Sequence, residues 1–159
     1  MVVRMSSEDV QFAEVDPASP AAVAAVLHYF AELGRRFETG FDPVAYATSS
    51  LAADRDQRFL LATRDGTTVG CGALRPLDDG VAEIKRMWVD PTVRGLGLGR
   101  RLLVQLEELA VNAGCHLIRL DTNGSLTEAI GLYERHGYRR IPRYNDNPYA
   151  QVWFEKVLD

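Results

Sequence analysis

The sequence is poor in cysteine and contains no cluster of metal-ligating residues. Its two cysteines, Cys71 and Cys115, lie far apart and have no metal-ligand spacing. The three histidines, His28, His116 and His136, are scattered and complete no ligand set with them. These absences argue against a disulfide framework and a metal centre. We therefore predict no metal, and two buried thiols in a reducing compartment.

The sequence also lacks a long hydrophobic run and an excess of positive charge. Residues 1–5 lead into no apolar stretch, and no later segment is long enough to span a bilayer. We therefore expect no signal peptide, no transmembrane helix and a cytoplasmic location. The formal net charge is −4, with 18 basic against 22 acidic residues, which disfavours nucleic acid or a membrane surface as a partner.

The composition is that of one globular domain. The chain has 159 residues, of which 47% are hydrophobic, enough to bury a core in a single domain over residues 1–159. Alternating and helical spacings of apolar residues divide it into strands and helices. The expected strands are residues 11–15, 59–63, 68–74, 81–89, 116–121, 138–141 and 151–157, and the expected helices are residues 20–34, 43–53, 98–113 and 125–136. This order, β-α-α-β-β-β-α-β-α-β-β, predicts an α/β fold in which helices pack on a mixed sheet.

Short motifs predict where several elements begin and turn. Ser19 followed by Pro20 is typical of a helix N-terminus, because serine caps the first turn and proline fits into it. The pair at residues 65–66, Asp-Gly, is typical of a two-residue hairpin turn. Ser125 and Glu128 have the spacing of a capping box, which predicts the start of the last helix.

The most informative segment is glycine-rich and precedes a predicted helix. Residues 94–101 read Arg-Gly-Leu-Gly-Leu-Gly-Arg-Arg. Glycine lets the backbone approach a ligand closely, and a helix N-terminus offers unpaired N–H groups with partial positive charge. Together they predict a cradle for a phosphate group. A bound polyanion would also relieve the arginines, because cations are disfavoured at a helix N-terminus.

Two classes of nucleotide site compete for this cradle. A dinucleotide site has the spacing G-x-G-x-x-G close behind a strand, and an acid about 20 residues later. Asp121 lies 22 residues after Gly99, but the glycine spacing differs and residues 90–94 separate the strand from the cradle. A Walker A motif is missing from the chain. The dinucleotide interpretation is therefore the weaker one.

Three blocks of sequence resemble the GCN5-related N-acetyltransferase (GNAT) superfamily. Residues 94–99 match its (Q/R)-x-x-G-x-(G/A) motif. Residues 82–89 look like the central strand before that motif, and residues 129–138 look like its helix end, A-x-x-L-Y-x-x-x-G-(F/Y). The spacing between the blocks is ordinary for the family. The resemblance covers nearly the whole chain and is strongest over residues 68–138.

This resemblance implies an N-acetyltransferase that moves an acetyl group from acetyl-CoA to a primary amine, with a small molecule as the favoured acceptor. The amine would attack the thioester directly, through a tetrahedral intermediate. The family implies a central strand splayed from its neighbour, so that its backbone pairs with the pantetheine arm and an N–H near Val89 stabilises the oxyanion. The implied acetyl-CoA-binding residues are Met87, Trp88, Val89, Arg94, Gly95, Leu96, Gly97, Leu98, Gly99, Arg100 and Asn123, and Arg101 would add charge.

Two residues are catalytic candidates for proton transfer. Glu83 stands where several family members have a general base, but a carboxylate with a pKa of about 4.3 needs burial or a water relay to deprotonate an ammonium with a pKa of about 10.4. An ion pair with Lys85, on the same strand face, is the alternative role. Tyr133 is the candidate acid for the departing thiolate, because a phenol pKa of about 10 and a thiol pKa of about 8.5 are close. Its alternative role is that of a core tyrosine.

One departure from the family pattern affects the expected contact with acetyl-CoA. Many members have an asparagine seven residues before the tyrosine, where this chain has Leu126. Asn123, at the end of the preceding strand, is the candidate substitute.

The acceptor side is expected between the loops at residues 34–41 and 144–149. The charged residues of this region are Glu38 and Asp146, which would attract an ammonium, and Arg35, Arg36 and Arg143, which would attract a carboxylate. Each of them is also explained as a solvated loop charge. The sequence leaves open whether the amine belongs to an amino acid, a polyamine, an aminoglycoside-like drug or a protein N-terminus.

Two other functions compete with the acetyltransferase. A regulatory module would bind CoA without catalysis, although the retention of both Glu83 and Tyr133 argues against it. A dinucleotide-binding oxidoreductase is the weaker alternative. A homodimer agrees with the resemblance, because dimers are common in the family.

Overall fold

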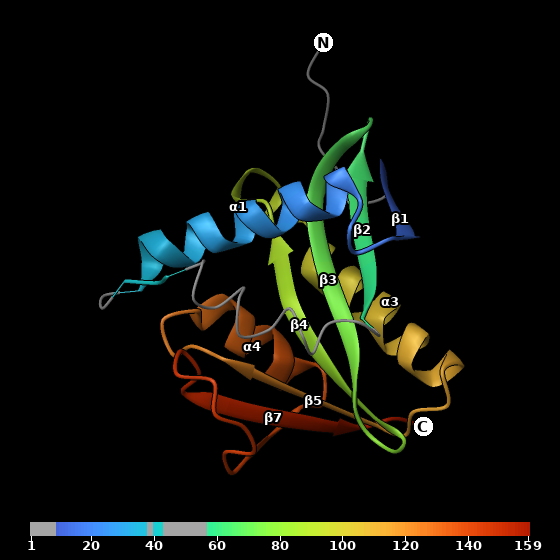
Figure 1. The fold of residues 1–159 in the computed structure, drawn as a ribbon, viewed down its shortest axis with the longest axis vertical. Coiled ribbons are helices and arrows are strands. Elements are labelled where there is room, and N and C mark those ends of the chain that lie inside the picture. Colours follow the sequence, from blue (N-terminus) through green and yellow to red (C-terminus); the bar gives the residue numbers. More distant parts are fainter. Residues whose placement is uncertain (1–8, 38–39, 43–56) are drawn as a thin grey trace.

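The protein folds into a single mixed sheet with helices on both faces (Figure 1). The computed structural model describes residues 9–37, 40–42 and 57–159. Its strands are β1 (Val10–Val15), β2 (Arg58–Arg64), β3 (Thr67–Asp78), β4 (Val81–Val89), β5 (Leu117–Thr122), β6 (Arg139–Ile141) and β7 (Val152–Val157). Its helices are α1 (Pro20–Arg36), the short 3-10 helix η2 (Pro91–Val93), α3 (Leu98–Asn112) and α4 (Thr127–Arg135). The helix expected over residues 43–53 lies outside the described residues.

The sheet has seven strands in the order β1-β2-β3-β4-β5-β7-β6. Strands β1 to β4 form an antiparallel meander, β4 and β5 run parallel, and β7 is antiparallel to both β5 and β6. The predicted mixed α/β sheet is therefore confirmed.

Two apolar clusters cover opposite faces of this sheet, because neighbouring residues of a strand point to opposite sides. Helices α3 and α4 pack on one face, around Leu106, Phe154 and Tyr133. Helix α1 packs on the other face through Ala22 and Ala25. Figure 1 shows α1 crossing the near face and α3 lying behind the sheet. Both faces of the central strands are thus buried, which explains their nearly continuous apolar sequences.

Strand β4 leaves its parallel neighbour after its first three residues. Pairing with β5 ends at Glu83, opposite Arg119, although β4 continues to Val89. On its other side the register with β3 shifts, and Arg86 takes a positive φ of 54°. An extra residue in one strand bends that strand and increases its twist. The splayed central strand implied by the family resemblance is therefore present.

The structure contains two of the three motifs that predicted where elements begin or turn. Ser19 caps α1, since its hydroxyl accepts from the Ala22 N–H at 3.3 Å. The hairpin turn at residues 65–66 is confirmed, because both residues have positive φ, 50° and 78°. The predicted capping box is wrong: α4 starts at Thr127 without a side-chain cap. Glu128 instead binds the Arg36 guanidinium on α1, so a tertiary ion pair replaces the local one.

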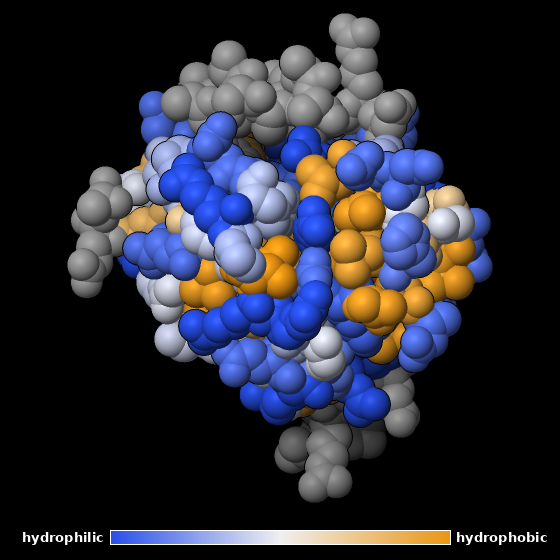
Figure 2. Space-filling view, turned by 90° about the horizontal axis from the view of Figure 1, so that it is seen from below, coloured by the Kyte–Doolittle hydropathy of each residue, from blue (hydrophilic) through white to orange (hydrophobic). Residues whose placement is uncertain are grey.

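The surface mixes polar and apolar residues. Viewed from below, hydrophobic residues show in patches that are separated by hydrophilic ones (Figure 2). In the described part of the chain, none of the helices has both the length and the apolar character needed to cross a bilayer. Both thiols are free; Cys71 is buried, whereas Cys115 is only partly buried.

Candidate active site

Two hollows meet where β4 and β5 separate. The first, called the glycine groove, has a volume of about 430 Å³ and runs between β4, the start of α3, and α4. The second, called the wedge cavity, has a volume of about 60 Å³ and lies between the splayed strands, the end of α1 and the loop before β7. The residues lining both are Tyr29, Leu33, Met87, Leu126, Ala129 and Tyr133. A molecule in one hollow would therefore face a molecule in the other.

The glycine groove ends on the N-terminus of α3. Gly95 and Gly97 both have left-handed backbone conformations, with φ of 84° and 78°. Gly97 is the N-cap and contributes no side-chain acceptor, so the N–H groups of the first turn remain available to a ligand. A Cβ on Gly99 would lie 3.2 Å from Leu132, which shows how closely α4 approaches this turn. This geometry is that of an anion site.

The arginines of the cradle have different surroundings. The Nε of Arg94 donates to the Val89 carbonyl at 3.0 Å, and its guanidinium pairs with Glu32 on α1. Arg100 is exposed and lines the groove. Arg101 lies over the ring of Phe12 at 5.0 Å and is absent from the described groove lining. Arg94 thus fixes the end of β4, and Arg100 is placed to meet a phosphate.

Most of the residues predicted to bind acetyl-CoA line the groove. These are Met87, Trp88, Val89, Arg94, Gly95, Gly97, Leu98, Gly99 and Arg100. Leu96 instead packs with an apolar cluster that includes Val93 and Leu98. Asn123 lines the wedge cavity, where its Nδ2 donates to the Tyr149 carbonyl at 2.8 Å and its Oδ1 accepts from the Ser125 N–H at 2.9 Å.

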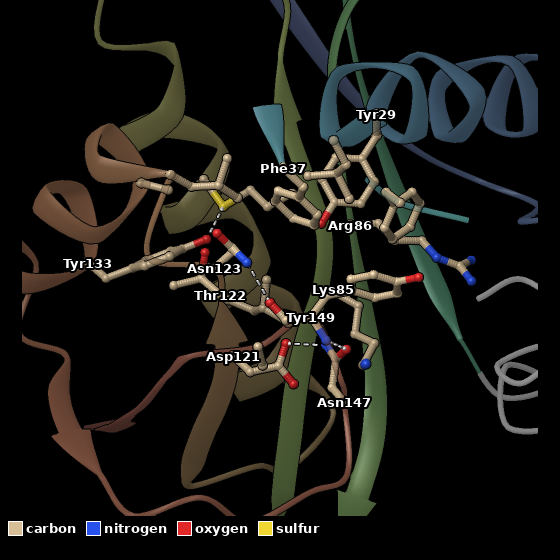
Figure 3. A pocket seen from close by; sticks show the side chains of 17 residues that line it. Tyr29, Phe37, Lys85, Arg86, Asp121, Thr122, Asn123, Tyr133, Asn147 and Tyr149 are labelled. Atoms are coloured by element: carbon tan, nitrogen blue, oxygen red, sulfur yellow. Dashed lines mark hydrogen bonds between the residues drawn. The ribbon is translucent and has the colours of Figure 1, made fainter. Parts of the chain in front are cut away.

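Tyr133 lies at the junction of the two hollows. Its hydroxyl donates to Sδ of Met87 at 3.8 Å (Figure 3). Its ring packs against those of Tyr138 and Phe154. Burial, together with the negative charge of Asp121, raises the pKa of the Tyr133 hydroxyl above its ordinary value. The phenol is therefore protonated at neutral pH, as a general acid must be.

Glu83 is completely enclosed, with an exposed fraction of 0%. Its carboxylate accepts from Arg75 Nε at 2.7 Å and from the Tyr144 hydroxyl at 2.5 Å, and Lys85 Nζ lies 3.6 Å away. Among the described residues, it lines neither the groove nor the cavity. The ion pair with Lys85 is therefore present, but Arg75 is the closer partner.

Asp121 is an acid of the wedge cavity that the sequence analysis had considered only as the acid of a dinucleotide site. Its two carboxylate oxygens accept from Nδ2 of Asn145 at 2.5 Å and Nδ2 of Asn147 at 3.0 Å (Figure 3 draws the latter). Asn145 Nδ2 also lies 3.5 Å from Glu83, so one amide links two carboxylates. The available sequence signal was the position of Asp121 near the end of β5, the strand that follows the predicted phosphate cradle and its helix.

The charges predicted for the acceptor side do not meet in the cavity. Asp146 is fully exposed and forms a salt bridge with Arg143 at 3.6 Å. Arg35 is exposed, and Arg36 lines the groove, where it binds Glu128. Glu38 lies outside the described residues. The two predicted loops do contribute, but through Phe37, Phe41, Asn147 and Tyr149.

Sequence and structure comparisons agree with this arrangement. The model of the "Acetyltransferase (GNAT) family" matches residues 23–138. An "IAA acetyltransferase" from Azospirillum brasilense is 45% identical over 87 residues, which are 54% of this chain and 57% of that protein. The chain thus spans little more than half of that relative's length.

Solved structures share the fold. An acetyltransferase of the GNAT family from Staphylococcus aureus superposes with a TM-score of 0.80 at 18% identity, over 94% of this chain and 99% of that one. A GNAT family acetyltransferase from Elizabethkingia anophelis, solved with acetyl-CoA bound, superposes with a TM-score of 0.67 at 17% identity, over 95% and 99%. The chain belongs to the acetyltransferase (GNAT) family. The predicted family is thereby confirmed, and the dinucleotide interpretation is set aside.

Proposed function

We propose that this protein transfers an acetyl group from acetyl-CoA to the primary amine of a small molecule. The observation that carries the proposal is the position of Tyr133, which lines both the glycine groove and the wedge cavity. Acetyl-CoA would occupy the groove and the amine the cavity. The thioester and the amine then meet beside a protonated phenol.

The pyrophosphate of acetyl-CoA would lie on the first turn of α3. Gly95, Gly97 and Gly99 let the backbone approach it, and Arg100 supplies positive charge. Leu96 would contribute through its main chain. Asn123 would contact the cofactor arm only from the side of the wedge cavity. Each of these contacts is part of the proposal.

The end of β4 would bind the acyl end of the cofactor. An N–H near Val89 is the proposed donor to the tetrahedral oxyanion, and Met87 and Trp88 border the pantetheine arm. Arg94 supports this segment, because its Nε holds the Val89 carbonyl at 3.0 Å. The bond from Arg94 to Glu32 ties the same segment to α1.

The reaction would follow direct attack. The neutral amine nitrogen bonds to the thioester carbon, the C–S bond breaks as the intermediate collapses, and the CoA thiolate takes a proton from Tyr133. The proton lost by the amine goes to a base, for which Glu83 is the candidate. Because Arg75 and Tyr144 enclose the carboxylate, that proton would reach Glu83 through a relay.

A thiol-release assay with acetyl-CoA and an amine panel tests this function. We expect amine-dependent release of free CoA. Tyr133→Phe should lower kcat by about 100-fold or more while the Kd for acetyl-CoA, measured by calorimetry, changes little. Binding of acetyl-CoA without thiol release on any amine would instead support the regulatory CoA-binding module. Unchanged turnover in the variant would refute the role of Tyr133 as the acid.

A further inference from the structure

The wedge cavity has an aromatic wall, defined as the rings of Tyr29, Phe37, Phe41 and Tyr149. The ring centroids of Phe41 and Tyr149 lie 4.6 Å apart, and those of Phe37 and Phe41 lie 5.8 Å apart. Leu33 and Leu126 add aliphatic surface at the junction with the groove. Such a lining favours an apolar or aromatic body over a heavily hydroxylated one, because hydroxyl groups would lose hydrogen bonds to water.

The same cavity carries a single acid among its described lining residues, Asp121. A carboxylate has about four acceptor sites, and the amides of Asn145 and Asn147 use two of them. Acceptor capacity therefore remains for one further donor. The two amides also hold the carboxylate in a fixed orientation, which preorganises it for a cationic partner.

The cations of the cavity are engaged elsewhere. Lys85 Nζ lies 3.6 Å from the buried carboxylate of Glu83, and the Arg86 guanidinium lies over the ring of Phe30 at 5.7 Å. Neither contact involves Asp121. Among the described lining residues, the negative charge that an incoming ammonium would meet is that of Asp121, and the nearby aromatic faces would add cation–π attraction.

We propose that the acceptor is a small monoamine with an apolar or aromatic body, whose ammonium is bound by Asp121 and whose body packs on the aromatic wall. This inference rests on the proposed acetyltransferase function and narrows its substrate class. A polyamine would bring charges for which the described cavity has no second acid. A sugar amine would place hydroxyl groups against Phe37, Phe41 and Tyr149.

The arrangement also places the amine near Tyr133, the proposed general acid. Asp121 and Tyr133 line the same small cavity, on β5 and α4 respectively (Figure 3). An ammonium bound at Asp121 would release one proton to solvent, and the neutral amine would then face the thioester at the junction with the groove. Asp121 is thus proposed as the residue that binds the acceptor, in addition to the proton-transfer residues.

The experiment compares acceptors that differ in one property. Thiol release is measured with 2-phenylethylamine, spermidine and glucosamine, each at saturating acetyl-CoA. We expect kcat/KM for 2-phenylethylamine to exceed the other two by at least about tenfold, the effect of roughly 1.4 kcal/mol. A preference for spermidine or glucosamine would overturn the inference and leave the acetyltransferase function intact. No release with any amine would contradict the function itself.

The charge contact is tested with Asp121→Asn. We expect KM for 2-phenylethylamine to rise about tenfold or more, whereas KM for O-benzylhydroxylamine, which is uncharged at neutral pH, changes less than threefold. A merely structural role of Asp121 would raise both KM values together and would overturn the proposal. Asp146→Asn is the matched control, since Asp146 is a fully exposed acid on the neighbouring loop. The Kd for acetyl-CoA should be the same in all three proteins.

Discussion

The hydroxyl of Tyr133 lies 3.8 Å from Sδ of Met87, where β4 has already left β5. A thioether is a weak acceptor, so this contact orients the phenol without binding its proton tightly. The proton can therefore be donated to a better acceptor, such as a thiolate. The contact between Tyr133 and Met87 therefore places the proposed acid at the point where the two strands separate.

The raised pKa of Tyr133 predicts the shape of the pH profile. An acid must be protonated, and a pKa above the ordinary phenol value keeps it so throughout the range up to about pH 10. We therefore expect kcat to show no loss from this group between about pH 7 and pH 10. Steady-state kinetics at saturating amine and acetyl-CoA measure it. A decline of kcat centred below pH 10 that is absent in Tyr133→Phe would contradict the expectation.

The left-handed backbone of Gly97 predicts the cost of a side chain there. Gly97→Ala should destabilise the fold by about 1–2 kcal/mol, because an L residue is strained at a φ of 78° even though nothing lies within 4 Å. The same change should weaken acetyl-CoA binding, since the cradle would shift. Gly34→Ala is the control: Gly34 lies within α1, also has open space, and should become more stable by about 0.5–1 kcal/mol. Urea unfolding and calorimetry measure both effects.

The burial of Glu83 predicts a large loss of stability when its charge is removed. Glu83→Gln leaves Arg75 without its 2.7 Å carboxylate partner, and we expect a loss of about 3 kcal/mol. Glu14→Gln breaks an exposed pair with Arg58 of the same length and should cost less than about 1 kcal/mol. Urea unfolding of both variants compares them directly.

The same Glu83 variant tests the proposed relay. If Glu83 receives the proton of the amine, kcat of the folded fraction should fall by about 100-fold. A normal kcat per folded molecule would assign Glu83 a purely structural role, in which its carboxylate binds Tyr144 and Asn145.

The pKa of the His136 imidazole should change when a polyanion binds in the glycine groove. Partial burial, together with the positive charge of Arg100, lowers the pKa of its imidazole below the ordinary value. His136 lines the glycine groove, so phosphates bound there would offset the arginine charge and raise this pKa. An NMR titration with and without CoA measures the change. A pKa that stays constant on CoA binding would place the phosphates away from Arg100.

Much of the donor side was predictable from sequence because it depends on local backbone chemistry. Gly95 and Gly97 supply the left-handed backbone of the turn before α3, and the spacing of these glycines and Gly99 is visible in the sequence. The position of Tyr133 was also visible, since its motif fixes it on one helix face. The positions of Leu96 and Asn123 were harder to predict, because whether a side chain faces the groove depends on the neighbouring elements.

The predicted capping box was wrong for a similar reason, because a residue from a distant part of the chain determines the contacts of Glu128. Ser125 and Glu128 have the correct spacing, but Arg36 on α1 offers Glu128 a charged partner from a distant part of the chain. The two bonds between this guanidinium and carboxylate are stronger than the single bond that Glu128 would accept from a backbone N–H in a capping box. Local propensity was outweighed by a tertiary contact.

The sequence by itself determined the succession of strands and helices along the chain, the phosphate cradle and the tyrosine that follows it, because each follows from spacing along the chain. Only the tertiary structure decided that Glu83 is enclosed and that Asp121 faces the acceptor cavity. Glu83 is enclosed by Arg75 and Tyr144, and Asp121 is held by Asn145 and Asn147. Tyr144 and the two asparagines lie more than twenty residues further along the chain and precede β7, which pairs with β5. Hydrogen bonds between such distant residues are set by packing of the sheet.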